Sequence, residues 1–192
     1  MEKFPGKKSI AVLISGRGSN LESLIKYSKK KNSLFKIELV ISNNLNAKGL
    51  EIANKSKIKN QYIEYSNKKN FENFSLKLLK KYKIDLVCLA GFMRILSREF
   101  IKKFSKPILN IHPSLLPKYK GLNTHYKAIK NKDIYSGATV HIVNEKLDSG
   151  KIIIQEKVKI LKTDKENTLR KKVLKIEHKI YPKAIMKLLT NY

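Results

Sequence analysis

Strand-sized apolar runs alternate with amphipathic segments through the first half of the chain, and this order limits the folds that are open to it. Apolar runs at 8–14, 35–41 and 84–90 have the length and composition of buried strands, and a short strand is expected near 61–64. The segments between them carry apolar residues at helical spacing. This β-α-β-α order predicts an α/β fold, with a Rossmann-like, mostly parallel twisted sheet and helices on both of its faces.

The pattern changes after Gly91, where the expected elements become shorter and prolines interrupt the loops. A long final segment has apolar residues at roughly helical spacing, and we expect Pro182 to bend or divide it. The elements expected in this half are a strand at 107–111, a helix at 124–130, strands at 138–143 and 151–159, and a helix over 164–189.

The length of the chain, 192 residues, suits one domain with a sizeable core. The sequence contains neither an internal repeat nor a linker of disordered composition, so we expect a single domain, 1–192. We expect two halves within it, an N-terminal βαβ half at 1–105 and a C-terminal half at 106–192.

A single cysteine, Cys88, lies inside an apolar run and is expected to be a core residue. One cysteine can form neither an internal disulfide nor a cysteine cluster for zinc, and we predict no metal site. Neither a signal-like leader nor an apolar run of membrane-spanning length occurs, so we expect a cytoplasmic protein without a membrane partner.

The formal charge of +27 makes a basic nucleic-acid-binding protein an alternative that has to be weighed. Only four of the 42 basic residues are arginine, the residue that reads phosphates and base edges in a bidentate manner. The lysines are scattered over every segment instead of gathering on one stripe. We therefore interpret the charge as a solvated surface that steers anionic substrates, and we expect no specific nucleic acid partner.

A glycine-rich turn at 15–20 follows the first predicted strand and opens the next helix. Such a turn presents backbone N–H groups and the positive end of a helix dipole, which predicts a phosphate-binding loop; an ordinary tight turn is the alternative. Leu21 stands where a dinucleotide fingerprint has its third glycine, and Asn43 and Asn44 stand where it has a ribose-binding acid. A phosphate monoester therefore fits better than a nicotinamide dinucleotide, and an oxidoreductase is the weaker rival.

Asn110 and His112 stand two residues apart at the end of a predicted strand, so their side chains are expected on the same side. Ligands bind at that end of an open α/β sheet, and a carboxamide beside an imidazole can donate to an oxyanion. Polar strand-end residues bonded to backbone groups are the alternative. Asp148 lies in a loop that ends at Gly150, where most aspartates only cap turns. His141 is expected in mid-strand, where a core histidine is the alternative to a functional one.

Six motifs together resemble the phosphoribosylglycinamide formyltransferase family in order and spacing. The asparagine, histidine and aspartate set is shared by folate-dependent formyltransferases, and the Ser-Gly-x-Gly-Ser-Asn loop narrows the substrate. The resemblance covers essentially the whole chain. Its motifs lie at residues 14–21, 89–96, 110–117, 137–141, 147–150 and 177–182.

The resemblance implies transfer of the formyl group of 10-formyltetrahydrofolate to the amine of 5-phosphoribosylglycinamide, in de novo purine (IMP) biosynthesis. The implied products are formylglycinamide ribonucleotide and tetrahydrofolate. The implied co-substrate is 10-formyltetrahydrofolate, with no metal. The implied partners are these small molecules, bound by a monomer or weak homodimer.

The catalytic residues that the resemblance implies are Asn110, His112 and Asp148. The attack of the amine builds negative charge on the formyl oxygen, which Asn110 and a protonated His112 are expected to stabilise. The Asp148 carboxylate is expected to raise the pKa of His112 toward the working pH. Proton transfer to the leaving folate nitrogen then passes through His112 or through a water held by Asp148.

Two groups of binding residues are implied in the same way, and residues 141–150 are implied to close around the pterin. The residues implied to bind the substrate phosphate and its ribose or glycinamide part are Gly18, Ser19, Asn20 and Glu177. The residues implied to bind the folate are Lys68, Met93, Arg94, Ile95, Leu96 and Asn110.

Other formyltransferases are alternatives within the same class. By the same resemblance, a methionyl-tRNA formyltransferase would carry a further C-terminal domain, and a formyltetrahydrofolate hydrolase would carry an N-terminal regulatory domain. We expect neither, because the first strand begins within ten residues of Met1 and the chain ends about ten residues after Pro182. The short C-terminal tail is expected to cost packing and not activity.

Overall fold

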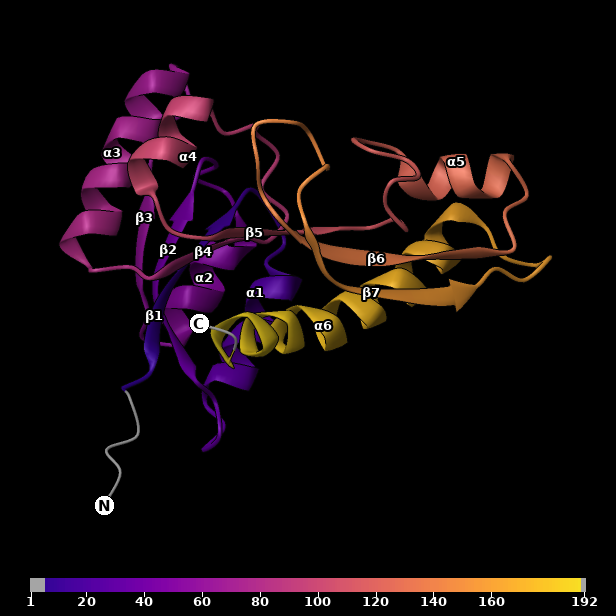
Figure 1. Ribbon diagram of the computed structural model, residues 1–192, viewed down its shortest axis with the longest axis horizontal. Coiled ribbons are helices and arrows are strands. Elements are labelled where there is room, and N and C mark those ends of the chain that lie inside the picture. The colour runs from indigo at the N-terminus through magenta and orange to yellow at the C-terminus, as the bar shows by residue number, and fades with distance from the viewer. Residues whose placement is uncertain (1–5, 191–192) are drawn as a thin grey trace. The chain divides into compact units, whose positions relative to one another are not determined.

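The structure is a computed structural model that describes residues 6–190 (Figure 1). The chain divides into two compact units, with the boundary between Ile108 and Leu109. We call residues 6–108 the first unit and residues 109–190 the second unit. In each unit, strands form the centre and helices pack against them.

The first unit contains the strands β1 (Lys8–Ile14), β2 (Phe35–Ser42), β3 (Lys59–Tyr62) and β4 (Leu86–Leu89). They pair in parallel in the order β3-β2-β1-β4. Residues 10–14 of β1 are all buried, as expected for a central strand that is covered on both faces. Because the strands run in the same direction, the loops that follow β1, β2 and β4 lie at one edge of the sheet.

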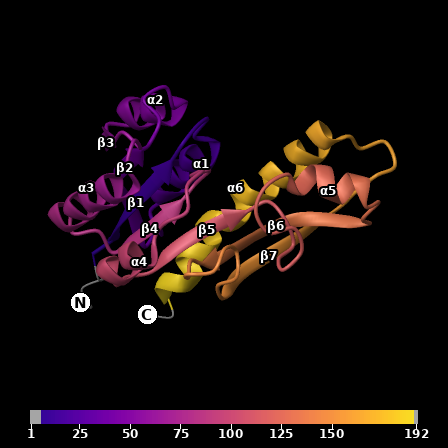
Figure 2. The same cartoon turned by 90° about the horizontal axis from the view of Figure 1, so that it is seen from above.

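The helices of the first unit are α1 (Ser19–Ser28), α2 (Lys48–Lys55), α3 (Lys68–Lys81) and α4 (Arg98–Phe104). α1 and α2 pack together on one face of the strands, and α3 and α4 pack together on the other (Figure 2). Right-handed crossovers explain this division, because the strand order reverses direction after β3. The predicted parallel sheet with helices on both faces is therefore present in this unit.

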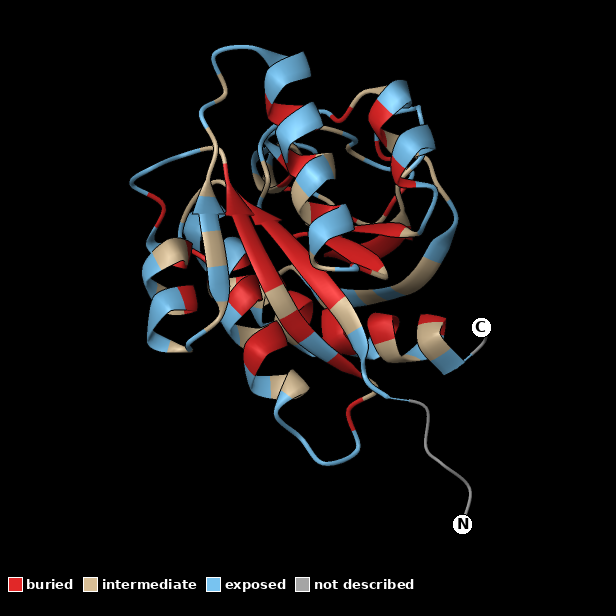
Figure 3. Ribbon diagram, turned by 90° about the vertical axis from the view of Figure 1, so that its left-hand side faces the viewer, coloured by how far each residue is buried: buried red, intermediate tan, exposed pale blue. Residues whose placement is uncertain are grey.

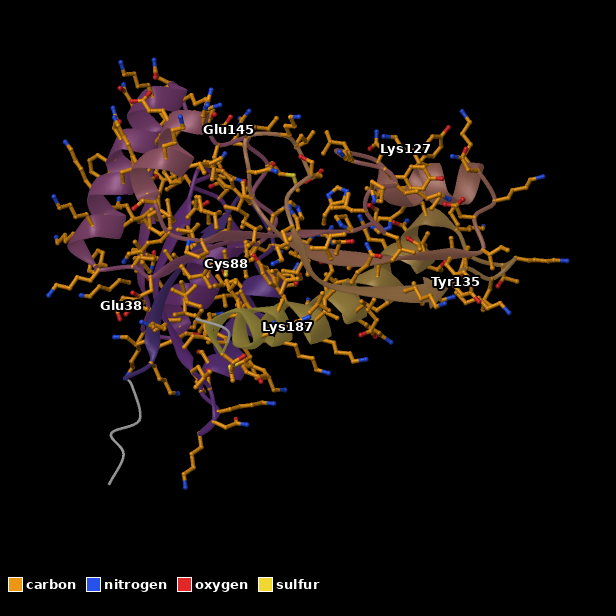
Figure 4. All side chains as sticks on the ribbon, in the orientation of Figure 1. Glu38, Cys88, Lys127, Tyr135, Glu145 and Lys187 are labelled. Atoms are coloured by element: carbon orange, nitrogen blue, oxygen red, sulfur yellow. The ribbon has the colours of Figure 1, made fainter. Side chains whose placement is uncertain are left out.

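Burial in the first unit is concentrated on the strands and on the helix faces that meet them (Figure 3). Leu13, Phe35 and Phe71 are fully buried. Burial of one such side chain stabilises the fold by about 1.5–3 kcal/mol. Cys88 lies on β4 with no exposed surface (Figure 4), which confirms the prediction that it is a core residue. Lysine side chains instead project outward from the ribbon, as the interpretation of the charge as a solvated surface requires (Figure 4).

The second unit contains β5 (Ile108–His112) from Leu109 onward, β6 (Tyr135–Ile142), β7 (Ile152–Lys159), α5 (Thr124–Lys130) and α6 (Glu166–Thr190). β6 pairs antiparallel with both β5 and β7. The register of β5 and β6 places Asn110 opposite His141. α6 runs alongside β6 and β7 and also packs against α5 (Figure 1).

Pro182 lies inside α6, which is one helix of 25 residues. Of the two expected effects of this proline, a bend or a division, the division is wrong, because α6 continues through it. A proline removes one backbone donor from a helix, and packing of the neighbouring residues offsets that loss. Tyr181 and Ile185 are fully buried, and the Tyr181 hydroxyl donates to the Leu109 carbonyl at 3.1 Å. Although α6 is long, neither it nor another helix among residues 6–190 is apolar enough to cross a membrane.

The strand pairings confirm the predicted fold class, an α/β protein with mostly parallel strands. β1 pairs in parallel with β2 and β4, and β2 pairs in parallel with β3. Residues 143–151 join β6 to β7, a connection too short for the crossover that parallel neighbours need. Length does not explain the antiparallel pairing of β5 and β6, because residues 113–134 join them and include α5.

Candidate functional site

The predicted phosphate-binding loop, residues 15–20, joins β1 to α1 in the first unit. Gly18 takes the N-cap position with φ +77°, a left-handed conformation that favours glycine. Gly18 provides no capping side chain, and the residues that begin α1 line a pocket of about 320 Å³. The pocket is lined by Ser15, Gly16, Arg17, Gly18, Ser19, Asn20, Ala90, Gly91 and Met93.

Gly49, in the first turn of α2, packs directly against the phosphate loop. Its N–H donates to the Gly16 carbonyl at 3.1 Å. A Cβ added at Gly18 would lie 2.6 Å from Gly49 Cα, and a Cβ added at Gly49 would lie 2.3 Å from Ile14 Cδ1. Sequence reasoning missed Gly49 as a residue that shapes the loop. The only signal was a glycine inside a helical pattern, which often marks a close backbone approach.

The segment that carries the predicted folate-binding residues follows β4 and forms neither helix nor strand between residues 90 and 97. Met93 and Ile95 are 67% and 62% exposed. Leu96 is buried instead, at 8% exposed. The Arg94 guanidinium lies 4.6 Å from the centre of the Tyr65 ring, a distance that allows a cation–π contact.

The predicted binding residues lie in different surroundings. Met93 lines the same pocket as the phosphate loop. Lys68 is the exposed first residue of α3. In the second unit, Glu177 is buried on α6, at 8% exposed.

Asn110, His112 and Asp148 meet in a buried polar cluster of the second unit. His112 Nδ1 lies 3.3 Å from Asp148 Oδ2, and Asn110 Nδ2 lies 3.4 Å from Asp148 Oδ1. Asn110 and His112 come from alternate positions of β5, as predicted, and Asp148 comes from the loop between β6 and β7. His112 and Asp148 are 5% and 7% exposed.

His141 is a fourth member of this cluster. Its Nε2 lies 3.3 Å from Asn110 Nδ2 and 3.6 Å from Asp148 Oδ1. Its Nδ1 lies 3.0 Å from the Ile142 carbonyl, an acceptor, so Nδ1 carries a proton. Nε2 faces both the Asn110 amide and the Asp148 carboxylate. Sequence reasoning left open whether His141 was a core histidine, because the register that places it opposite Asn110 is not visible in the sequence.

Asp148 is held as an ionised carboxylate. It has φ +46°, and its Oδ2 accepts from the Gly121 N–H at 2.8 Å. Burial of the carboxyl group opposes ionisation, but the His141 side chain, the Gly121 N–H and His112 together outweigh it, so the pKa of Asp148 lies below 3.8. The side chain therefore does more than cap its own turn, since its bonds reach distant parts of the unit.

The Asp148 carboxylate raises the pKa of His112, as expected, but the net shift of that pKa is downward. Burial of the imidazole lowers the pKa below 6.5, and the Tyr119 carbonyl and the Asp148 carboxylate recover only part of that loss. His112 Nε2 lies 2.8 Å from the Tyr119 carbonyl oxygen, while Nδ1 faces Asp148. The Tyr119 carbonyl and the Asp148 carboxylate are both acceptors, so they favour a protonated His112 ring. Burial favours the neutral ring.

No cluster that could hold a metal ion is found among residues 6–190. The buried cluster of the second unit supplies an amide donor, an imidazole whose pKa lies below its ordinary value, and a carboxylate that stabilises positive charge on that imidazole.

A model of the formyl transferase family matches residues 8–185, and the chain belongs to this family. Its curated relatives include two kinds of protein. The human trifunctional purine biosynthetic protein adenosine-3 is 45% identical over 186 residues, which are 95% of this chain and 18% of that protein. The chain thus spans less than a fifth of the length of the trifunctional relatives that it matches.

Single-function relatives match over most of their length. The phosphoribosylglycinamide formyltransferase of Escherichia coli K12 is 42% identical over 180 residues, covering 92% of this chain and 85% of that protein. A crystal structure of phosphoribosylglycinamide formyltransferase from Brucella melitensis aligns with a TM-score of 0.91 at 39% identity, over 95% of each chain. The fold is therefore that of the formyltransferases.

Proposed function

We propose that this chain transfers the formyl group of 10-formyltetrahydrofolate to the amine of 5-phosphoribosylglycinamide, a step of de novo purine biosynthesis. The observation that carries the proposal is the buried cluster in which Asn110 and His112 both lie within 3.4 Å of the Asp148 carboxylate. An amide, an imidazole and a carboxylate provide the donors and the proton acceptor that acyl transfer to an amine requires.

The phosphate loop supports a nucleotide as the formyl acceptor. We assign the substrate phosphate to the N–H groups and side chains of Gly18, Ser19 and Asn20, because a helix N-terminus attracts a phosphate dianion. Glu177 is assigned to the ribose or glycinamide part of the same substrate.

The folate co-substrate is assigned to Lys68, to Asn110 and to residues 93–96. The exposed side chains of Met93 and Ile95 fit the flat face of a planar ring system, because binding such a face would remove them from water. Lys68 and Arg94 supply positive charge for the carboxylates and carbonyl groups of a folate.

The bound folate supplies an activated formyl group, whose oxygen gains negative charge when the amine attacks. One C–N bond forms to the substrate amine, the C–N bond to the folate breaks, and a proton moves from the amine to the leaving nitrogen. Asn110 is assigned as a donor to the oxygen. Its hydrogen bonds to His141 and Asp148 are long, at 3.3 and 3.4 Å, so exchanging one for a shorter bond to an oxyanion is favourable.

His112 is assigned the proton transfer. Its lowered pKa keeps the ring neutral near pH 7, ready to accept a proton as the attacking amine becomes positive. The imidazolium that forms has one N–H beside the Asp148 carboxylate and the other beside the Tyr119 carbonyl, so both of its donors meet acceptors. His112 then returns the proton to the leaving nitrogen, and Asp148 stabilises the charged ring in between.

Three further properties belong to this proposal. We place the reaction in the cytoplasm, with small molecules as its partners. We assign no metal to it, because the amide, imidazole and carboxylate groups complete the charge balance of the transfer. We also propose a monomer or weak homodimer as the working form.

The test is a spectroscopic assay for conversion of 10-formyltetrahydrofolate, run with and without 5-phosphoribosylglycinamide. The proposal requires conversion that depends on the amine substrate and yields formylglycinamide ribonucleotide. Equal conversion without the amine would instead identify a formyltetrahydrofolate hydrolase, in which water attacks the formyl carbon. Absence of conversion in both arms would reject a folate-dependent reaction.

A further inference from the structure

The segment between β4 and α4, residues 90–97, forms neither helix nor strand, although the Ala90 N–H still donates to the Leu13 carbonyl of β1 at 2.9 Å. Gly91 takes φ +71°, which turns the chain away from the direction of β4. The exposed side chains of Met93 and Ile95 make little contribution to fixing the backbone, because apolar groups stabilise a fold only when they are removed from water. Other contacts must therefore fix the position of the segment.

The first of these contacts is the hydroxyl of Ser15, at the end of β1. Ser15 Oγ accepts from the Met93 N–H at 2.9 Å and donates to Asn43 Oδ1 at 2.6 Å. The Ser15 carbonyl accepts from Asn44 Nδ2 at 3.0 Å. Because β1 lies between β2 and β4, this one residue links the loops that follow all three strands.

The second contact is the carboxylate of Glu72, on α3. Glu72 is 7% exposed, and a carboxylate is rarely buried unless it is hydrogen-bonded. Its Oε1 accepts from the Ser97 N–H at 2.7 Å, and its Oε2 accepts from the Ser97 hydroxyl at 2.5 Å. Ser97 Oγ in turn caps α4 by accepting from the Phe100 N–H at 3.0 Å.

An aromatic cluster supports the segment between these two ends. The Phe71 ring, fully buried on α3, stacks at 5.6 Å from the Phe92 ring and lies 5.2 Å from the Tyr65 ring. The Arg94 guanidinium lies over the Tyr65 ring. The segment is thus anchored from β1, from α3 and from the loop before α3, while its apolar residues at positions 93 and 95 face solvent.

We propose that Ser15 and Glu72 are positioning residues that hold the backbone of residues 93–96 in the conformation that binds the folate co-substrate. The inference rests on the proposed function, which assigns the folate to this segment. Neither residue is assigned to the reacting atoms. A preorganised backbone binds a ligand more tightly because its ordering cost is met in the folded protein before binding.

Loss of either anchor should weaken folate binding. For Glu72, which does not line the phosphate pocket, the weakening should be selective for folate. Ser15→Ala removes the acceptor of the Met93 N–H, and Glu72→Gln replaces a charged acceptor that receives two hydrogen bonds from Ser97. Hydrogen bonds of this kind contribute enough that we expect KM for 10-formyltetrahydrofolate to rise by about tenfold in each variant. kcat at saturating folate should change by less than about threefold, because the cluster around His112 is left intact.

Matched variants separate positioning from general destabilisation. Glu99→Gln changes the same carboxylate type on neighbouring α4, where Glu99 is exposed and pairs only with Lys103 among the ion pairs described, at 2.7 Å. Asn43→Ala removes the other partner of the Ser15 hydroxyl and leaves the bond from Met93 N–H in place. Both controls should keep the wild-type KM for folate. Ser15→Thr retains a hydroxyl, so its KM for folate should lie between those of the wild type and Ser15→Ala.

The experiment measures KM for both substrates, kcat, and the binding of tetrahydrofolate by calorimetry in the full-length chain. A folate KM unchanged in Ser15→Ala and Glu72→Gln, or equal increases in KM for both substrates in Glu72→Gln, would overturn the positioning roles. If Glu72→Gln fails to fold, Ser97→Ala removes the hydroxyl that Glu72 accepts from, and the same selective weakening is required. An inactive wild-type chain would reject the proposed function, while the calorimetric comparison would still decide the positioning roles.

Discussion

His112 Nδ1 lies 3.3 Å from Asp148 Oδ2, and less than a tenth of either side chain is exposed. A carboxylate at this distance favours a protonated imidazole, yet burial keeps the pKa of His112 below 6.5. The pair therefore holds a neutral histidine next to a fixed negative charge. The histidine is therefore free of the extra proton at rest, and the carboxylate stabilises the ring once it accepts a proton during the reaction.

Replacing the carboxylate tests this relationship directly. Asp148→Asn removes the negative charge that stabilises a protonated His112, so we expect kcat to fall by roughly a hundredfold or more. Glu156→Gln is the matched control, because Glu156 is a carboxylate of the same unit that pairs with Lys179 on the surface. Steady-state turnover of both variants is the measurement, and a loss shared by Glu156→Gln would argue against a specific role for Asp148.

Removal of the imidazole should be at least as costly. His112→Ala takes away the group that accepts and returns the proton, and turnover should fall by roughly two or more orders of magnitude. The side chain is buried, so circular dichroism and a thermal melt are needed to establish that the variant is folded. Near-normal turnover in a folded His112→Ala protein would reject the mechanism.

Titration of His112 should also determine how kcat falls at acidic pH. Because the neutral imidazole accepts the proton from the amine, kcat should fall as the pH drops through the lowered pKa of His112, below 6.5. Above that pKa the rate should reach a plateau. Measurement of kcat from pH 5 to pH 8 decides the point, and activity that rises toward pH 5 would mean that the protonated ring is the active form.

Stability should respond to pH through the same two groups. The folded-state pKa values of His112 and Asp148 both lie below their ordinary values of 6.5 and 3.8. The unfolded chain therefore binds protons first as the pH falls, so the free energy of unfolding decreases below pH 6.5 for His112 and below pH 3.8 for Asp148. Urea unfolding at several pH values, compared with His112→Gln, isolates the first contribution. An unfolding free energy equally sensitive to pH in His112→Gln would assign the effect to other groups.

The sequence alone predicted the features that depend on local patterns. The apolar run of β1, the glycine-rich turn after it and the alternate placement of Asn110 and His112 on β5 are all set by residues close in the chain. Helical spacing also located α6, although Pro182 gave a false indication of a break, because the packing that compensates for a helix proline is tertiary.

The remaining features depend on residues that are distant in the chain. The position of His141 beside Asn110 is a consequence of strand register, and the bond from Gly121 to Asp148 depends on two loops. The direction of the His112 pKa shift could not be predicted either, because it is decided by the depth of burial against the strength of two acceptors. Composition and spacing carry no information about that balance.

Gly49 offers the last test, because its importance is visible only in the folded chain. Gly49→Ala would place a methyl group 2.3 Å from Ile14 Cδ1 and 3.3 Å from Gly18 Cα, so the end of the Ile14 side chain has to move and the phosphate loop has to give way slightly. Overpacking of this kind costs about 1–3 kcal/mol of unfolding free energy, and the displaced loop should also weaken binding of the phosphorylated substrate. Gly6→Ala is the control, since a Cβ there meets nothing within 4 Å. The measurements are urea unfolding and KM for 5-phosphoribosylglycinamide, and a Gly49→Ala protein that matches the wild type in both would show that the helix and loop can separate at no cost.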